Sequence, residues 1–132
     1  MKKSHLIILI VVLLIISWLF VRFVIGGNED SWIKDSKGIY VKHGNPATTP
    51  DYILKQQQAV AQAQTFYNLA KNNSIIFSSQ CLGSFDNYAF DIVNVPRIAE
   101  DNQIENQCGD YIQKKVHHFI ELDKDGNIVR IE

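Results

Sequence analysis

The stretch IELDKDGNIVRI (residues 120–131) alternates apolar with charged or polar side chains on either side of an Asp-Gly pair. Alternation with a period of two is typical of a β-strand, and Asp-Gly favours the two-residue turn of a hairpin. A turn at residues 125–126 separates the apolar and charged side chains onto opposite faces. The facing pairs are then Leu122 with Val129, Ile120 with Ile131, and Glu121 with Arg130. Because each of these pairs is complementary, we predict a hairpin here.

Strand-like segments precede this hairpin, and polar or glycine-containing stretches separate them. Together with the hairpin they are rich in β-branched and aromatic residues, as strands are. The predicted strands are residues 75–82, 88–95, 112–122 and 128–131. A long acidic loop joins the second to the third.

A helix is predicted over residues 50–72. Thr49 can cap it, Pro50 suits the first helical position, and Asp51 favours the positive end of the helix dipole. Its apolar residues recur at helical spacing and form one stripe: Tyr52, Ala59, Val60, Ala63, Phe66, Tyr67 and Ala70. One helix packed on a small antiparallel sheet of three or four strands makes residues 50–132 an α+β domain.

The N-terminal part of the chain is strongly apolar. Residues 6–21 are interrupted only by Ser17, and the apolar run continues past Arg22. At about 1.5 Å per residue, 20 helical residues span about 30 Å, the hydrocarbon thickness of a bilayer. We therefore expect residues 6–25 to be a transmembrane anchor in contact with membrane lipid. The alternative is a signal peptide cleaved near residue 26 or 27, although the run is long for one and the cleavage pattern is poor.

The charges that flank the anchor set its expected orientation. Two lysines precede it, whereas acidic and basic residues offset each other after it, so the positive-inside rule keeps residues 1–5 in the cytoplasm. The rest of the chain is then extracytoplasmic, at the cell membrane. Residues 26–49 are expected to be a tether with a small hairpin, whose turn is at 34–38, and a linker over 44–49.

Composition and motifs limit the functional classes. The first 25 residues hold three of the 13 basic residues and none of the 14 acidic ones, so the remainder has a formal net charge of −4. That charge argues against nucleic-acid binding. The sequence lacks a glycine-rich phosphate loop, H-E-x-x-H, G-x-S-x-G and paired-cysteine spacing, so no cofactor is expected. Residues 121–132 have EF-hand-like spacing, but the hairpin explains the same residues and no metal site is expected.

Cys81 and Cys108 are the two cysteines of the sequence. In a small exported domain, a disulfide between them is the default expectation. The alternative is a nucleophilic cysteine served by His117 or His118, which an oxidising compartment and an even cysteine count argue against.

The two histidines are adjacent in a predicted strand, so their side chains point to opposite faces and cannot hold one metal ion together. We expect one of them to be partly buried and the other exposed. The enzymatic alternative is a small envelope hydrolase in which His117 or His118 acts with a nearby acid, Asp110 or Glu105.

The tether contains Trp32 and then Gly-Ile-Tyr-Val-Lys-His-Gly-Asn-Pro at residues 38–46. This segment resembles one in short, membrane-anchored, uncharacterised exported proteins of uncultivated bacterial lineages. Their pattern has a cysteine two residues after the tryptophan, where this chain has Lys34, so any disulfide of that motif is missing. The order of one helix and then antiparallel strands is also similar to cystatin-like and PepSY-like modules. These resemblances imply an exported, anchored protein and no particular activity.

The expected function is that of a membrane-anchored binding or interaction module, with an envelope protein or peptide as partner. Its contact surface is expected on the sheet face that the helix leaves uncovered, beside the acidic loop 97–110. The candidate binding residues are Tyr88, Tyr111, His117, Phe119 and Glu105. A structural spacer of the envelope is a further alternative, and it predicts tolerance of substitutions away from the cysteines and the helix stripe.

Overall fold

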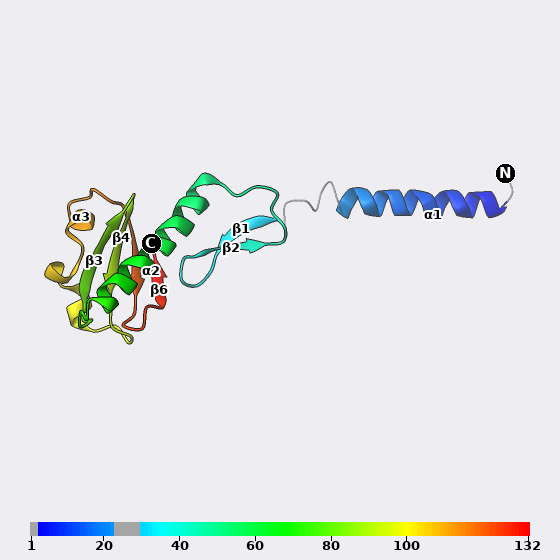
Figure 1. Cartoon of the computed structure of the whole chain (residues 1–132). Helices are drawn as coiled ribbons and strands as arrows, with labels where there is room; N and C mark the ends of the chain where they lie inside the picture. Colours follow the sequence, from blue (N-terminus) through cyan, green and yellow to red (C-terminus); the bar gives the residue numbers. More distant parts are fainter. Residues whose placement is uncertain (1–2, 23–29) are drawn as a thin grey trace. The chain divides into compact units, whose positions relative to one another are not determined.

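The computed structural model describes residues 3–22 and 30–132 (Figure 1). The end of the predicted anchor (23–25), the start of the predicted tether and its alternative cleavage site (26–29) lie outside the described residues. The chain divides into two compact units, which are Met1–Ile33 with Lys42–Ala47, and Lys34–Val41 with Thr48–Glu132.

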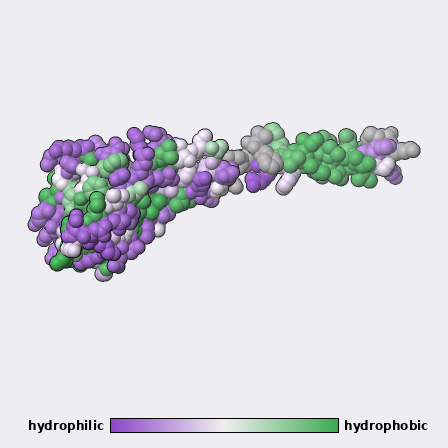
Figure 2. Space-filling model, in the orientation of Figure 1, coloured by the Kyte–Doolittle hydropathy of each residue, from purple (hydrophilic) through white to green (hydrophobic). Residues whose placement is uncertain are grey.

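Helix α1 (Lys3–Phe20) is long and apolar enough to cross a membrane. Its apolar side chains are exposed, and Figure 2 shows a continuous apolar surface over most of its length. A helix satisfies its own backbone hydrogen bonds, which a segment inside hydrocarbon must do. A signal sequence near an N-terminus has the same character, so α1 agrees with either origin.

Strands β1 (Ser31–Lys34) and β2 (Tyr40–His43) form a two-stranded sheet, which confirms the small hairpin predicted in the tether. Asp35 organises the turn, because one of its carboxylate oxygens accepts hydrogen bonds from the backbone N–H groups of Lys37 (2.8 Å) and Ile39 (2.9 Å).

Residues 34–41 belong to the α+β unit, although the sequence placed them in the tether. Gln56 binds both sides of the hairpin loop: its Nε2 donates to the carbonyl of Gly38 and its Oε1 accepts from the N–H of Tyr40, each at 2.9 Å. The N–H of Ile131 also donates to the carbonyl of Lys37 at 2.7 Å. These long-range bonds attach the loop to the unit, and local patterning could not show them.

Helix α2 (Asp51–Asn72) confirms the predicted helix. Pro50 occupies the N-cap position and makes no side-chain cap hydrogen bond, so the predicted cap at Thr49 is wrong. The buried face contains Ala59, Ala63, Tyr67 and Ala70 of the predicted stripe, with Ile53 and Gln56 in addition. Tyr52, predicted in the stripe, is 54% exposed because Ile53 takes the core position one residue later.

Four further strands form the main sheet, in the order β3-β4-β5-β6. They are β3 (Gln80–Phe85), β4 (Tyr88–Ile92), β5 (His118–Leu122) and β6 (Ile128–Ile131). The α+β class is therefore confirmed. The predicted strand at 75–82 begins only at Gln80, and the one at 112–122 begins only at His118, because α3 (Gly109–Ile112) precedes it.

The β3–β4 and β5–β6 pairs are antiparallel, but β4 and β5 are parallel, so the predicted antiparallel pairing is wrong there. A parallel pair needs a crossover of a dozen or more residues, and residues 93–117 supply it. This crossover contains α3 and two short 3₁₀ turns, η3 (Ala99–Asn102) and η4 (Ile104–Asn106). The long acidic loop predicted between these strands thus carries the chain from one end of the sheet to the other.

The β5–β6 hairpin has two of its three predicted pairs, Ile120 with Ile131 and Glu121 with Arg130. Leu122 pairs with Ile128 instead of Val129, because a β-bulge interrupts the register. The turn spans residues 123–126 and has Gly126 in the left-handed region (φ 85°). Such a turn with a glycine bulge is longer than the predicted two-residue turn, and this shifts one pair.

The sheet has a buried cluster on each face. On one face, α2 packs against Phe90, Ile92, Ile120 and Leu122, which are fully buried. On the other face lies a smaller cluster made by the crossover and the alternate strand residues: Ala89, Cys108, Val116 and Phe119, with Tyr111 against them. Because successive residues of a strand point to opposite faces, Ala89, Asp91, Phe119 and Glu121 belong to this second face.

Candidate functional site

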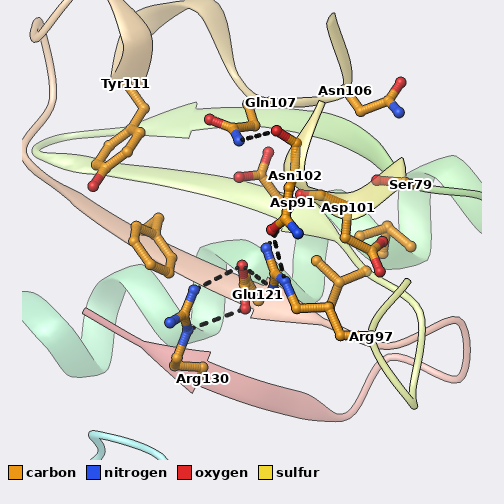
Figure 3. Close-up of a pocket in the computed structure, with 13 residues that line it drawn as sticks. Ser79, Asp91, Arg97, Asp101, Asn102, Asn106, Gln107, Tyr111, Glu121 and Arg130 are labelled. Atoms are coloured by element: carbon orange, nitrogen blue, oxygen red, sulfur yellow. Dashed lines mark hydrogen bonds and ion pairs between the residues drawn. The ribbon is translucent and has the colours of Figure 1, made fainter. Parts of the chain in front are cut away.

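A cavity of about 220 Å³ lies on the second face, between the sheet and the crossover (Figure 3). Strands β4, β5 and β6 contribute its floor, and residues of the crossover together with Phe119 of β5 form its walls. Its lining is unusually rich in groups that form hydrogen bonds or carry charge: Ser79, Asp91, Arg97, Asp101, Asn102, Asn106, Gln107, Glu121 and Arg130. We call this cavity the crossover pocket.

Glu121 lies between two guanidinium groups (Figure 3). Its Oε1 accepts hydrogen bonds from Arg97 Nη1 at 2.8 Å and from Arg130 Nη2 at 3.2 Å, and its Oε2 accepts one from Arg130 Nε at 3.2 Å. The Glu121 side chain is only 6% exposed, whereas those of Arg97 and Arg130 are 38% and 47% exposed. The two guanidinium groups therefore offset the cost of burying the Glu121 carboxylate, and both of them remain partly exposed to solvent.

Asp101 holds the wall of the pocket in place. One of its carboxylate oxygens accepts from the backbone N–H of Asn94 at 3.0 Å, and the other accepts from that of Ile98 at 2.8 Å. Burial raises the pKa of Asp101, but these hydrogen bonds outweigh it and lower the pKa below its usual value. Arg97 donates in turn to the Asp101 carbonyl at 3.1 Å. The crossover segment that carries Arg97 is thus fixed by its own polar contacts.

Asp91 is the second carboxyl group of the floor and pairs with Glu121 in the parallel register. It is 9% exposed, and its Oδ1 has no hydrogen-bond partner within the described part of the chain. Burial is the main reason that its pKa is raised to about 7; a hydrogen bond from the Cys108 backbone opposes the rise, Glu121 adds to it and Arg97 lowers it. Asp91 is therefore a buried carboxyl group that changes its charge near neutral pH.

Two aromatic rings form the apolar wall of the pocket. Tyr111 and Phe119 meet edge to face with centroids 5.2 Å apart, and the Arg130 guanidinium lies 4.8 Å from the centroid of the Phe119 ring. Tyr111 and Gln107 also line an adjoining hollow of about 400 Å³ with His117. The pocket and this hollow thus form neighbouring depressions that share one aromatic side chain.

The predicted binding residues are distributed over different places. Tyr111 and Phe119 line the crossover pocket, and His117 lines the adjoining hollow. Tyr88 lies in the cluster on the α2 side, so its expected position on the uncovered face is wrong. In the parallel register it pairs with His118, and His118 points to the face opposite its neighbour Phe119. Glu105 is exposed in η4 and is not among the pocket-lining residues.

Both histidines are exposed, so the prediction of one partly buried histidine is wrong. His117 Nδ1 lies 2.9 Å from Asn87 Oδ1, and the His118 ring stacks on Tyr88 at 5.0 Å. Asp110 accepts a hydrogen bond from Ser84 Oγ at 2.6 Å. Within the described residues, the side-chain hydrogen bond of Asp110 is thus with Ser84, and that of His117 is with Asn87.

Cys81 and Cys108 form a disulfide, as predicted. Their sulfur atoms and a carboxylate oxygen of Asp91 all lie within 4.8 Å of one another. The sulfurs are bonded to each other and are not thiolates, so this group is not a metal site in the oxidised protein.

Sequence reasoning did not identify Asp91, Arg97 or Arg130 as site residues. A signal existed for Asp91, because it is a charged residue within the otherwise apolar segment Tyr-Ala-Phe-Asp-Ile-Val at residues 88–93. The predicted pairing of Glu121 with Arg130 also placed half of the ion-pair cluster correctly. Only the path of the crossover brings Arg97 to Glu121.

Comparison with known proteins adds no relative, since no protein-family model, curated protein or solved structure matches the chain.

Proposed function

We propose that this protein is a binding module anchored in the cell membrane by α1, with its α+β unit on the extracytoplasmic side. The length and apolar character of α1, the lysines before it and the disulfide support this location, because disulfides persist in oxidising compartments. The resemblance of residues 32–46 to exported, membrane-anchored proteins favours the same location.

The crossover pocket is the proposed binding site, and the observation that carries the proposal is its combination of an aromatic wall with a polar floor. A few fixed polar groups beside aromatic side chains are typical of ligand sites. The pocket volume of about 220 Å³ is of the size of one large side chain. The adjoining hollow continues past Tyr111, so an extended peptide could place one side chain in each depression.

The charges of the pocket favour a peptide over a polyanion. Arg97 and Arg130 are offset by Glu121 and Asp101, and Asp91 is divided between its charged and neutral forms near neutral pH. The amide side chains that line the pocket, those of Asn102, Asn106 and Gln107, offer both donors and acceptors, as a peptide backbone does. We therefore propose an uncharged polar segment of an envelope protein as the ligand.

A matched pair of glutamine substitutions tests this function. The full chain in detergent micelles is panned against a library of short displayed peptides, with empty micelles as the background. Gln107→Trp fills the pocket rim, and Gln58→Trp adds the same side chain on the exposed surface of α2. We expect selected peptides to bind the parent and Gln58→Trp equally, and to lose at least about tenfold in affinity with Gln107→Trp. Enrichment of no peptide, or equal binding to both variants, would refute the proposal.

A further inference from the structure

The disulfide has one exposed and one buried end. Cys81 lies on β3, at the edge of the sheet, and is exposed. Cys108, immediately before α3, is 1% exposed and belongs to the buried cluster of the second face. Asp91 is the register partner of Cys81 on the neighbouring strand, and its carboxyl oxygen lies within 4.8 Å of both sulfurs. An exposed cysteine, a buried cysteine and a buried carboxyl group are therefore adjacent.

We propose that this disulfide is a thiol–disulfide exchange site, in which an external dithiol attacks Cys81 and Asp91 delivers a proton to Cys108. This activity shares Asp91 with the floor of the crossover pocket, but it differs from peptide binding because it depends on the two sulfurs, which do not line the pocket, and not on the aromatic wall.

The exchange balances with a dithiol as the reductant. Its thiolate attacks Cys81 Sγ and forms a mixed disulfide, while the Cys81–Cys108 bond breaks and its electron pair goes to Cys108 Sγ. The Asp91 carboxyl group gives its proton to that sulfur and becomes a carboxylate. The second thiolate of the dithiol then attacks its own sulfur in the mixed disulfide, releases Cys81 as a thiolate that takes a proton from water, and leaves the external molecule oxidised.

The surroundings of Cys108 explain why this sulfur needs a proton. Its Sγ lies 3.3 Å from the carbonyl oxygens of Gly83 and Phe90, and apolar side chains surround it. Carbonyl oxygens and burial both disfavour a thiolate, whereas a thiol could donate a hydrogen bond to either carbonyl. The reduced state is therefore expected to hold Cys108 as a thiol, which makes a nearby acid useful in the step that breaks the bond.

Asp91 is suited to this role because its pKa is raised to about 7, so it carries a proton in much of the population at neutral pH. The charged or titratable groups that line the pocket with it come from every neighbouring element: Glu121 on β5, Arg130 on β6, and Arg97, Asp101 and Tyr111 on the crossover. Since the protonated form is the active one, reduction should slow as the pH rises through 7. The reverse reaction, oxidation of the dithiol protein, should become faster because the carboxylate accepts the Cys108 proton.

Two aspartate-to-asparagine variants test the inference in the full chain in detergent. Asp91→Asn removes the acid with little change in shape, and Asp86→Asn makes the same change at an exposed turn residue with positive φ, which asparagine tolerates. The rate of reduction by dithiothreitol is measured between pH 6 and pH 8 by alkylating samples and determining their intact mass. Each observed rate is divided by the thiolate concentration, which gives the corrected rate. Circular dichroism confirms that each variant is folded.

For the parent and Asp86→Asn, we expect observed rates that are proportional to thiol concentration. Their corrected rates should fall about tenfold from pH 6 to pH 8, as the protonated fraction of a group with this pKa does. For Asp91→Asn, the corrected rate should be flat with pH and at least about tenfold slower than the parent at pH 6. Glutathione, a monothiol, should be trapped on Cys81 and not on Cys108.

The inference would be overturned by a parent rate that is independent of thiol concentration, since reduction would then be limited by unfolding and not by attack of the thiolate on the folded chain. A flat corrected profile in the parent, or trapping on Cys108, would overturn it as well. Because these readouts use the parent chain, they decide the question even if Asp91→Asn does not fold. Loss of peptide binding in Gln107→Trp would leave them unchanged, which separates this inference from the proposed function.

Discussion

Replacing Asp91 with asparagine should change how the stability of the α+β unit depends on pH. Burial raises the pKa of Asp91 from 3.8 to about 7, so the folded protein holds a proton that the unfolded chain releases near pH 4. The folded state is therefore favoured at low pH, and this contribution is lost as the pH rises from about 4 to about 7. Above pH 7 the carboxylate is charged in both states and the loss is complete. Asparagine has no such titration.

The size of the effect follows from the shift. Each pKa unit corresponds to about 1.4 kcal/mol, so a rise from 3.8 to about 7 corresponds to about 4 kcal/mol. The free energy of unfolding of Asp91→Asn, minus that of the parent at the same pH, should therefore increase by about 4 kcal/mol between pH 4 and pH 7.5. Taking the difference cancels the carboxyl groups whose pKa is lowered in the folded state, such as Asp101 and Asp123, because both proteins contain them.

The assay is urea unfolding of the full chain in detergent, followed by circular dichroism at half-unit steps of pH. Asp86→Asn is the control, because it makes the same chemical change at an exposed side chain. A difference between Asp91→Asn and the parent that stays constant within about 1 kcal/mol across this range would refute the reasoning.

Further substitutions test the packing by the same unfolding assay. Replacing both Cys81 and Cys108 with alanine should lower stability by about 3 to 4 kcal/mol, because the disulfide closes a loop with a sequence separation of 27. Gln56→Leu should cost about 2 to 4 kcal/mol, since it leaves two backbone groups of the hairpin loop without their partner; Gln57→Leu on the exposed face should be nearly neutral. Gly126→Ala should cost at least about 1 kcal/mol, because φ is 85° and a Cβ would lie 2.6 Å from the Tyr67 ring. A loss of stability under 0.5 kcal/mol in the double cysteine variant, in Gln56→Leu or in Gly126→Ala would contradict the contact assigned to that residue.

The elements that sequence alone predicted well are those whose information is local. The bounds of α2 follow from proline at its start and a helical apolar period, and those of β6 follow from alternation after Asp-Gly. The cysteine pairing follows from there being one possible pair within the chain. The apolar character of α1 is a matter of composition. In each case the physical cause is a pattern of neighbouring residues, the number of cysteines or the composition of the segment.

Tertiary structure decided the features that depend on where the crossover runs. β4 and β5 are parallel because residues 93–117 carry the chain back to the end of the sheet where β4 begins. The alternation of apolar and polar residues along the two strands would be the same for an antiparallel pair. The parallel pairing moves Tyr88 to the α2 side and aligns Asp91 with Glu121. It also brings Arg97 to Glu121 and Cys108 to Asp91, across 24 and 17 positions of sequence. The sequence by itself determined helix α2 and the hairpin of β5 with β6, because local periodicity and turn residues control them. The tertiary structure decided the pocket and the raised pKa of Asp91, because both arise from contacts between distant segments.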